Sequence, residues 1–175
     1  FATLEAAIDR VSDILRTGAI AVELLDEEVL TAAANNAECR TYLDVVAPID
    51  GALPRAVLYA EYQNEDTGDA IAKGFAGLDE LPGNPVVRLY TSRAWALRKA
   101  GEPLLHGLST TRKPQTFVED NSIPVEALPR FVRDFKAIVQ RHGTRAAYYA
   151  HAGVGVLHVR PMIDVHDAAD RERML

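Results

Sequence analysis

Cysteine is almost absent from this sequence, and Cys39 is the only one in 175 residues. One thiol excludes an intrachain disulfide framework, a cysteine-rich zinc module and an iron–sulfur cluster bound by this chain alone. A single cysteine is also typical of a reducing compartment. We therefore expect a cytoplasmic location, with any membrane attachment peripheral and supplied by a parent protein.

Positive charge and long apolar runs are scarce as well. Nineteen lysines and arginines stand against 25 aspartates and glutamates, so the formal net charge is −6. An acidic chain without a basic run lacks the electrostatic footprint of a nucleic-acid-binding protein. No apolar stretch is long enough to span a bilayer, and no basic segment followed by an apolar one marks a signal peptide.

Glycine-rich phosphate-binding motifs are missing too. The sequence has no Walker loop, and Gly153-x-Gly155 lacks the third glycine of a dinucleotide fingerprint. We therefore expect this chain to bind no nucleotide cofactor of its own by either route.

What is present is an ordinary globular composition, 48% hydrophobic and 25% charged. The length favours one domain, and we expect residues 1–175 to form a single domain. The chain begins with Phe1 rather than Met, and Leu175 follows no helix-ending signal. We therefore expect a piece of a longer protein.

Hydrophobic periodicity predicts mixed helices and strands. Helices are expected at 4–15, 69–81, 92–100 and 124–139, with a short one from 26, and strands at 19–25, 54–62, 85–90 and, interrupted by glycines, 146–160. Residues 101–115 are rich in Gly, Pro, Ser and Thr and are expected to form a surface loop. This order predicts an α+β protein, a ferredoxin-like α/β sandwich whose mostly antiparallel sheet has helices packed on one face.

The densest chemical signal is the pair His151 and His158. Side chains alternate faces in a regular strand, so a separation of seven would point the two rings apart. Gly153 and Gly155 permit a turn that can bring both imidazoles to one place, and Arg160 would share the face of His158. Two imidazoles and a guanidinium suit a divalent metal and a substrate carboxylate. The alternative is two unrelated histidines, one at a strand end and one in the core.

Residues 149–161 resemble the H-x-G-D-G-N-L-H signature of the C-terminal domain of FAD-linked oxidases and dehydrogenases. That group belongs to the vanillyl-alcohol oxidase superfamily and includes D-lactate, glycolate and D-2-hydroxyglutarate dehydrogenases. Other matches follow in the family's order: A-x-E-L-x-D at 21–26, W-x-L-R at 95–98 and E-D-x-x-x-P at 119–124. Val154 and Val156 replace the Asp and Asn of the signature. The variant V-G-x-L-H-V-R-P resembles a subgroup of very large proteins that fuse flavin and iron–sulfur modules on one chain.

The resemblance implies roles for five residues. His151 and His158 match the family's metal-binding histidines, and zinc is the expected divalent metal. Arg98 matches the arginine that binds the substrate carboxylate, Arg160 lies where relatives place a polar substrate-contacting residue, and Lys113 lies near a substrate-contacting lysine. The alternatives are that Arg98 is a solvated helix arginine, that Arg160 forms a surface ion pair and that Lys113 is an exposed loop lysine. A further carboxylate ligand and the catalytic histidine lie downstream in the family, so the resemblance implies an incomplete metal site and no catalytic residue within this chain.

The resemblance therefore implies the substrate- and metal-binding domain of an FAD-dependent 2-hydroxyacid dehydrogenase, which oxidises a D-2-hydroxy acid to the 2-oxo acid and passes hydride to the flavin. FAD is expected to be bound mainly by another domain of the same parent chain, which would also carry any iron–sulfur cluster. We expect the isolated chain to fold, to bind no flavin tightly and to be inactive. The alternative is a non-catalytic ferredoxin-like module for a partner or small ligand, which histidines on opposite faces would favour.

Overall fold

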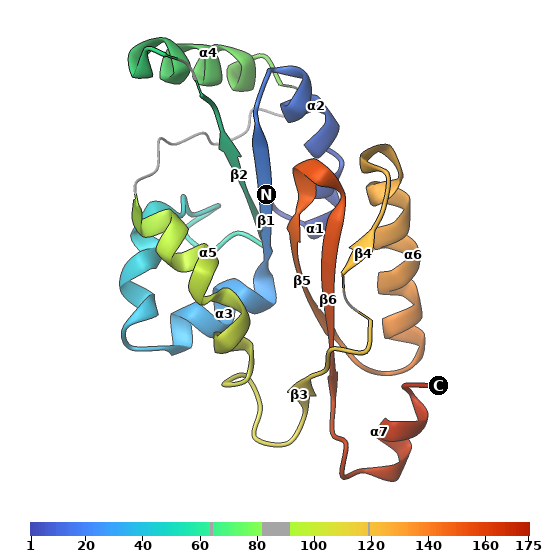
Figure 1. Ribbon diagram of the computed structural model, residues 1–175. Coiled ribbons are helices and arrows are strands. Elements are labelled where there is room, and N and C mark those ends of the chain that lie inside the picture. The colour runs from blue at the N-terminus through green and yellow to red at the C-terminus, as the bar shows by residue number, and fades with distance from the viewer. Residues whose placement is uncertain (64, 82–91, 119) are drawn as a thin grey trace.

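The computed structural model describes residues 1–63, 65–81, 92–118 and 120–175. Its centre is an antiparallel sheet in which four main strands follow the order β2-β1-β5-β6 (Figure 1). These strands are β1 (Ala21–Asp26), β2 (Ala56–Glu61), β5 (Ala146–His151) and β6 (Val156–Ile163). Two short strands, β3 (Lys113–Pro114) and β4 (Asn121–Ser122), pair with β6. The expected strand at 85–90 lies outside the described residues.

One face of the sheet carries the larger apolar core. The helices α1 (Leu4–Ile8), α2 (Val11–Arg16) and α6 (Leu128–Arg141) pack there. Alternate residues of the central strands point into this core, namely Val22, Leu24, Tyr148, Ala150, Leu157 and Val159. In the expected 4–15 helix the apolar side chains from Leu4 to Ile14 are buried and Leu15 is partly buried. A hydrogen bond from the Arg10 N–H to the Ala7 carbonyl oxygen, three residues earlier, lies where the segment divides into two helices.

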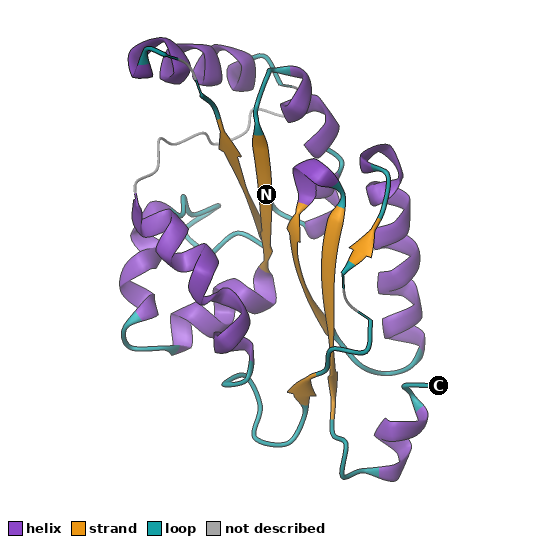
Figure 2. Ribbon diagram, viewed as in Figure 1, coloured by secondary structure: helices purple, strands orange, loops and turns teal. Residues whose placement is uncertain are grey.

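The opposite face carries a second apolar cluster at one end of the sheet. It is formed by α3 (Glu27–Asn35), the 3-10 helix η1 (Cys39–Val45) and α5 (Ser92–Leu105), which pack against Leu25, Tyr59, Ala147 and Tyr149. Figure 2 shows helices on both sides of the strands. The expected α+β class with an antiparallel sheet flanked by helices is confirmed. The expectation that helices pack on one face only is corrected, because helices pack against both faces. Apolar side chains alternate to both sides of the central strands, so both faces of the sheet must be buried.

The junction of β1 and α3 is fixed by Asp26, which is buried. Its Oδ1 accepts the N–H groups of Glu28 and Val29 at 3.1 Å and so caps α3. Its Oδ2 accepts the N–H of Tyr148 on β5 at 2.7 Å. One carboxylate therefore joins a helix start to two strands of the sheet.

Helix α5 is longer than the sequence predicted. It continues to Leu105 through Gly101 and Pro103, so the first part of the expected 101–115 loop is helical. Its buried stripe is Ala94, Leu97, Gly101 and Leu105. A Cβ at Gly101 would lie 2.9 Å from Val29, so the glycine allows α5 to approach α3 closely. Burial of this stripe outweighs the weak helix propensity of glycine and proline.

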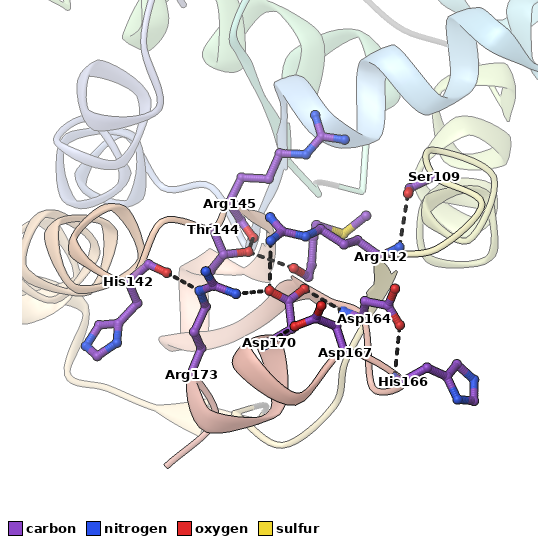
Figure 3. Close-up of polar contacts among 11 residues, drawn as sticks. Ser109, Arg112, His142, Thr144, Arg145, Asp164, His166, Asp167, Asp170 and Arg173 are labelled. Carbon is purple, nitrogen blue, oxygen red and sulfur yellow. Dashed lines mark hydrogen bonds and ion pairs between the residues drawn. The ribbon is translucent and has the colours of Figure 1, made fainter.

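The chain ends in α7 (Ala168–Glu172), which is anchored by the buried carboxylate of Asp170 (Figure 3). Asp170 accepts bonds from the Arg112 guanidinium at 2.7 Å, from the N–H of Asp164 at 2.9 Å and from Arg173. A hollow of about 240 Å³ lies between these groups and Thr111. Its charged lining residues already bond one another, so we assign the cluster to holding α7 against the segment that leads into β3.

The remaining helical segments are α4 (Thr67–Asp79), η2 (Val125–Ala127) and η3 (Ala152–Val154). Asp66 caps α4 by accepting the N–H groups of Gly68 and Asp69. Among the described helices, none is both long and apolar enough to cross a bilayer.

Candidate functional site

The β5–β6 hairpin brings His151 and His158 to the same face of the sheet. Tyr149 pairs with His158 and His151 pairs with Val156, so all four side chains share one face. The turn between the strands is η3, and it ends at Gly155, whose φ is +74°. The two rings lie edge to face, with centroids 5.5 Å apart and planes at 78°. The glycine-containing turn therefore brings both imidazoles to one face, as the sequence predicted.

Tyr149 forms a floor beneath this cluster. Its ring stacks on His158 across the strands, with centroids 4.7 Å apart. The guanidinium carbons of Arg98 and Arg160 lie 5.6 and 5.7 Å from the centroid of the same ring. Burial, reinforced by the charge of Glu102, raises the pKa of Tyr149 to about 12, so its hydroxyl is neutral at physiological pH. The structure thus gathers both predicted arginines and His158 around one aromatic ring.

Arg98 and His151 are joined by a carboxylate that the sequence reasoning assigned no role. Oε2 of Glu23, on β1, accepts bonds from Nε of Arg98 at 2.9 Å and lies 2.8 Å from its Nη2. Nδ1 of His151 lies 2.8 and 3.0 Å from the two oxygens of the same carboxylate. Arg98 is therefore neither a solvated surface residue nor an unshielded cation. Glu23 offsets part of its charge.

His158 has a carboxylate partner of its own. Its Nδ1 lies 2.8 Å from Oδ1 of Asp120, which precedes β4 and has a φ of +57°. Burial lowers the pKa of His158, and the charges of His151 and Arg98 act in the same direction, whereas the Asp120 carboxylate opposes them. His158 is therefore neutral at physiological pH, which is the form that binds metals.

Lys113 and His166 are held elsewhere. Nζ of Lys113 donates to the carbonyl oxygens of His106 at 2.9 Å and of Ser109 at 2.6 Å, so its charge steadies the loop that follows α5. His166 is exposed in the turn before α7, where its N–H donates to Asp164 (Figure 3). The contacts of both residues are structural, and the substrate contact predicted for Lys113 gains no support from them.

The two imidazoles fit one part of a metal site. Because each Nδ1 faces a carboxylate, which only accepts hydrogen bonds, each Nε2 carries the free lone pair. A shared cation about 2.0–2.1 Å from each Nε2 would lie roughly 3 Å from each ring centre, a distance that centroids 5.5 Å apart permit. Within residues 1–63, 65–81, 92–118 and 120–175, however, no group of three or more His, Cys, Asp or Glu side chains could hold a metal ion. The described residues supply two ligands of a site that needs more.

The same hairpin does not fit a flavin pyrophosphate. A Cβ on Gly153 would lie 2.9 Å from the Val22 nitrogen, and one on Gly155 would lie 1.9 Å from the Ile123 carbonyl oxygen. Both glycines therefore face protein backbone, where a phosphate loop would present its glycines to the ligand. The hairpin glycines therefore do not form a phosphate cradle.

Three contributors to the site were missed from the sequence: Glu23, Tyr149 and Asp120. A signal existed for Glu23, which is the one charged residue within the apolar run 19–25 and is buried between Val22 and Leu24 on their strand. A buried charge in a strand requires a partner and so marks a polar cluster. The partners themselves come from residues 75 and 128 positions away, which no local pattern shows.

Fold and site together define a domain that presents two guanidiniums and two carboxylate-bound imidazoles on one face of an antiparallel sheet. The chain belongs to the family of FAD linked oxidases, C-terminal domain, whose model matches residues 1–175. It is similar to the D-2-hydroxyglutarate dehydrogenase of Escherichia coli (strain K12), with 24% identity over 94% of this chain and 18% of the relative. The enzymes of the same name from Pantoea ananatis and Pseudomonas putida are 25% identical over 93% and 37% identical over 43% of this chain. They are matched over 17% and 8% of their own lengths, so the chain spans less than a fifth of these relatives.

Proposed function

We propose that residues 1–175 form the single substrate- and metal-binding domain of an FAD-dependent 2-hydroxyacid dehydrogenase. The observation that carries this proposal is the shared face of His151, His158, Arg98 and Arg160 around the Tyr149 ring. Membership of the FAD-linked oxidase C-terminal family supports it. The alternative of a non-catalytic module would be favoured by histidines on opposite faces, and here they share one face.

The two arginines would bind the acid groups of the substrate. Arg98 donates its Nε–H to Glu23, and its forked guanidinium would bind a substrate carboxylate through further N–H groups. Arg160, whose guanidinium carbon lies 5.7 Å from the centroid of the Tyr149 ring, would supply a second guanidinium. Two anion-binding groups suit an acid with two carboxylates, and the similar proteins are named D-2-hydroxyglutarate dehydrogenases. We therefore propose a D-2-hydroxy dicarboxylic acid as the substrate, with D-2-hydroxyglutarate as the first candidate.

His151 and His158 would contribute their Nε2 atoms to a divalent cation, zinc being the first candidate. Such a cation lowers the free-energy cost of forming an alkoxide from the substrate hydroxyl, while FAD is the acceptor of the hydride. This chain's own part is to orient the acid and to keep the His158 imidazole neutral, since burial lowers the pKa of His158. The remaining ligand and the base that takes the hydroxyl proton are proposed to lie outside this chain.

We propose that FAD is bound mainly by another domain of a cytoplasmic parent protein, together with any iron–sulfur cluster. The glycines of the hairpin face backbone, which supports this assignment. Without the flavin and the base, the 175-residue chain would not turn over substrate. Visible flavin absorbance that co-purifies with this chain would contradict the assignment.

The test uses the full-length parent protein with an artificial electron acceptor and a panel of 2-hydroxy acids. We expect reduction of the acceptor with a D-2-hydroxy dicarboxylate. Arg98→Ala should raise KM at least tenfold, and His151→Ala should lower kcat. Arg130→Ala is the matched control, because Arg130 is exposed on α6 and pairs with the exposed Asp134. Failure of every hydroxy acid, or unchanged kinetics in both site variants, would contradict the proposal.

A further inference from the structure

Glu23 stands out because its carboxylate lies within an otherwise apolar part of the sheet. Only 10% of its side chain is exposed, and its strand neighbours Val22 and Leu24 are buried. A carboxylate in such a place destabilises the fold unless it is paired and hydrogen-bonded. The presence of Glu23 at a buried position of β1 therefore points to a role other than packing.

This one carboxylate holds two side chains from distant segments. On one side it receives the Nε–H of Arg98, from α5, at 2.9 Å. On the other it receives the Nδ1–H of His151, from the end of β5, at 2.8 Å. Register places Glu23 beside His151, because Leu24 pairs with Ala150 and Leu25 with Tyr149. The contact thus follows from strand pairing and does not depend on a chance side-chain rotamer.

We propose that Glu23 is a positioning residue that fixes both the orientation and the tautomer of His151 and couples them to the placement of Arg98. This inference deepens the proposed function and rests on it for its metal and substrate. His151 is half exposed, and its bond to Glu23 ties the ring to β1. The bond to Glu23 places the proton on Nδ1 and directs the Nε2 lone pair away from β1, toward any shared cation.

Coupling to Arg98 follows from the shared oxygen. Oε2 of Glu23 accepts from Arg98 and lies 3.0 Å from Nδ1 of His151. A carboxylate that loses one partner turns toward the other, so a change at the anion-binding end alters the hydrogen bond at the metal-binding end. The position of Arg98 in the anion site and the orientation of His151 in the proposed cation site therefore depend on each other through Glu23.

The partner of the other histidine provides an internal contrast. Asp120 also receives an Nδ1–H, but 72% of its side chain is exposed, so water can replace it. The buried Glu23 has no such replacement. We therefore expect loss of Glu23 to disturb the histidine pair much more than loss of Asp120.

The experiment compares Glu23→Gln with wild type and with the matched control Glu28→Gln. Glu28 is a similarly buried carboxylate, 14% exposed, whose arginine partner is Arg145, outside the site. The first readout is the ring-nitrogen NMR spectrum of His151, which reports its tautomer. The second is zinc affinity of the 175-residue chain by calorimetry at fixed pH. Glu23→Asp, which keeps the charge but is too short to reach both partners, replaces Glu23→Gln if the latter does not fold.

We expect the Glu23 variants to lose the pure Nδ1–H tautomer of His151 and to bind zinc 10- to 100-fold more weakly, with Asp120→Asn affected less and Glu28→Gln close to wild type. An unchanged His151 spectrum and unchanged zinc affinity in the Glu23 variants would overturn the inference while leaving the proposed function standing. If wild type binds no zinc, the metal part of the proposed function fails, and the tautomer readout still decides the role of Glu23.

Discussion

His151 and His158 lie diagonally across the β5–β6 hairpin, with ring centroids 5.5 Å apart, although an odd separation of seven would oppose them in a straight strand. The four residues 152–155 form the turn that restores a common face. The proposed chemistry depends on this turn, and its geometry is open to a direct test.

Gly155→Ala should destabilise the fold strongly. Its φ is +74°, and a Cβ there would lie 1.9 Å from the Ile123 carbonyl oxygen, a backbone atom that cannot move aside cheaply. We expect a loss of about 3 kcal/mol or more in the free energy of unfolding, measured by urea denaturation. Gly143→Ala is the matched control, because its φ is +63° but nothing lies within 4 Å of the added Cβ. It should cost only about 1 kcal/mol. Equal losses in the two variants would show that the hairpin does not pack on Ile123 as described.

The stability of the metal-free chain should decrease in mild acid because of His158. Burial lowers the pKa of its imidazole below the ordinary 6.5, so between the two pKa values the unfolded chain binds more protons than the folded one. The free energy of unfolding should therefore fall as pH drops below 6.5. Urea denaturation with a chelator present measures this slope, and His158→Gln should reduce it. If the stability of His158→Gln falls with pH as steeply as that of wild type, His158 is not the group responsible.

Asp170→Asn should release α7. The carboxylate is buried and holds Arg112 and Arg173, so its neutral replacement leaves two guanidiniums poorly paired. We expect a loss of about 2–4 kcal/mol and faster amide exchange in α7. Asp134→Asn, which alters the exposed pair with Arg130, should change stability by less than about 0.5 kcal/mol. Slow exchange in α7 of the Asp170 variant would argue that apolar contacts, not this carboxylate, hold the helix.

Lys113→Met separates two roles of that residue. The ammonium bonds the carbonyl oxygens of His106 and Ser109, which predicts a loss of about 1–2 kcal/mol of stability with little change in the KM of the parent enzyme. Denaturation and steady-state kinetics on the same variant measure both quantities. A large rise in KM at full stability would instead support the substrate contact that the family resemblance implied.

The elements that the sequence predicted best are those whose signal is local. The strands around Val22 and Leu58 and the helix from Leu128 are read from apolar periodicity, and all three are present. The predicted helix ended too early, at residue 100, because Gly101 and Pro103 usually break helices. The helix continues through Gly101 because that residue packs closely against α3. The packing of α3, η1 and α5 on the second face of the sheet could not be predicted either, because it depends on tertiary contacts.

In the site, the residue types were predictable and their partners were not. Arg98 was identified through a family resemblance, and His151, His158 and Arg160 were identified through spacing and that resemblance. Glu23 and Asp120 hold the two imidazoles through contacts that only strand pairing and chain reversal create. Lys113 was placed in the site by position along the chain, whereas its Nζ is used on loop carbonyl oxygens.

The most direct test of the account is zinc titration of the 175-residue chain, followed by ring-nitrogen NMR of its histidines. The account predicts one equivalent of weakly held zinc that shifts Nε2 of both His151 and His158, and loss of that zinc in either alanine variant. Zinc that shifts neither ring, or that binds equally well to His151→Ala and His158→Ala, would contradict it.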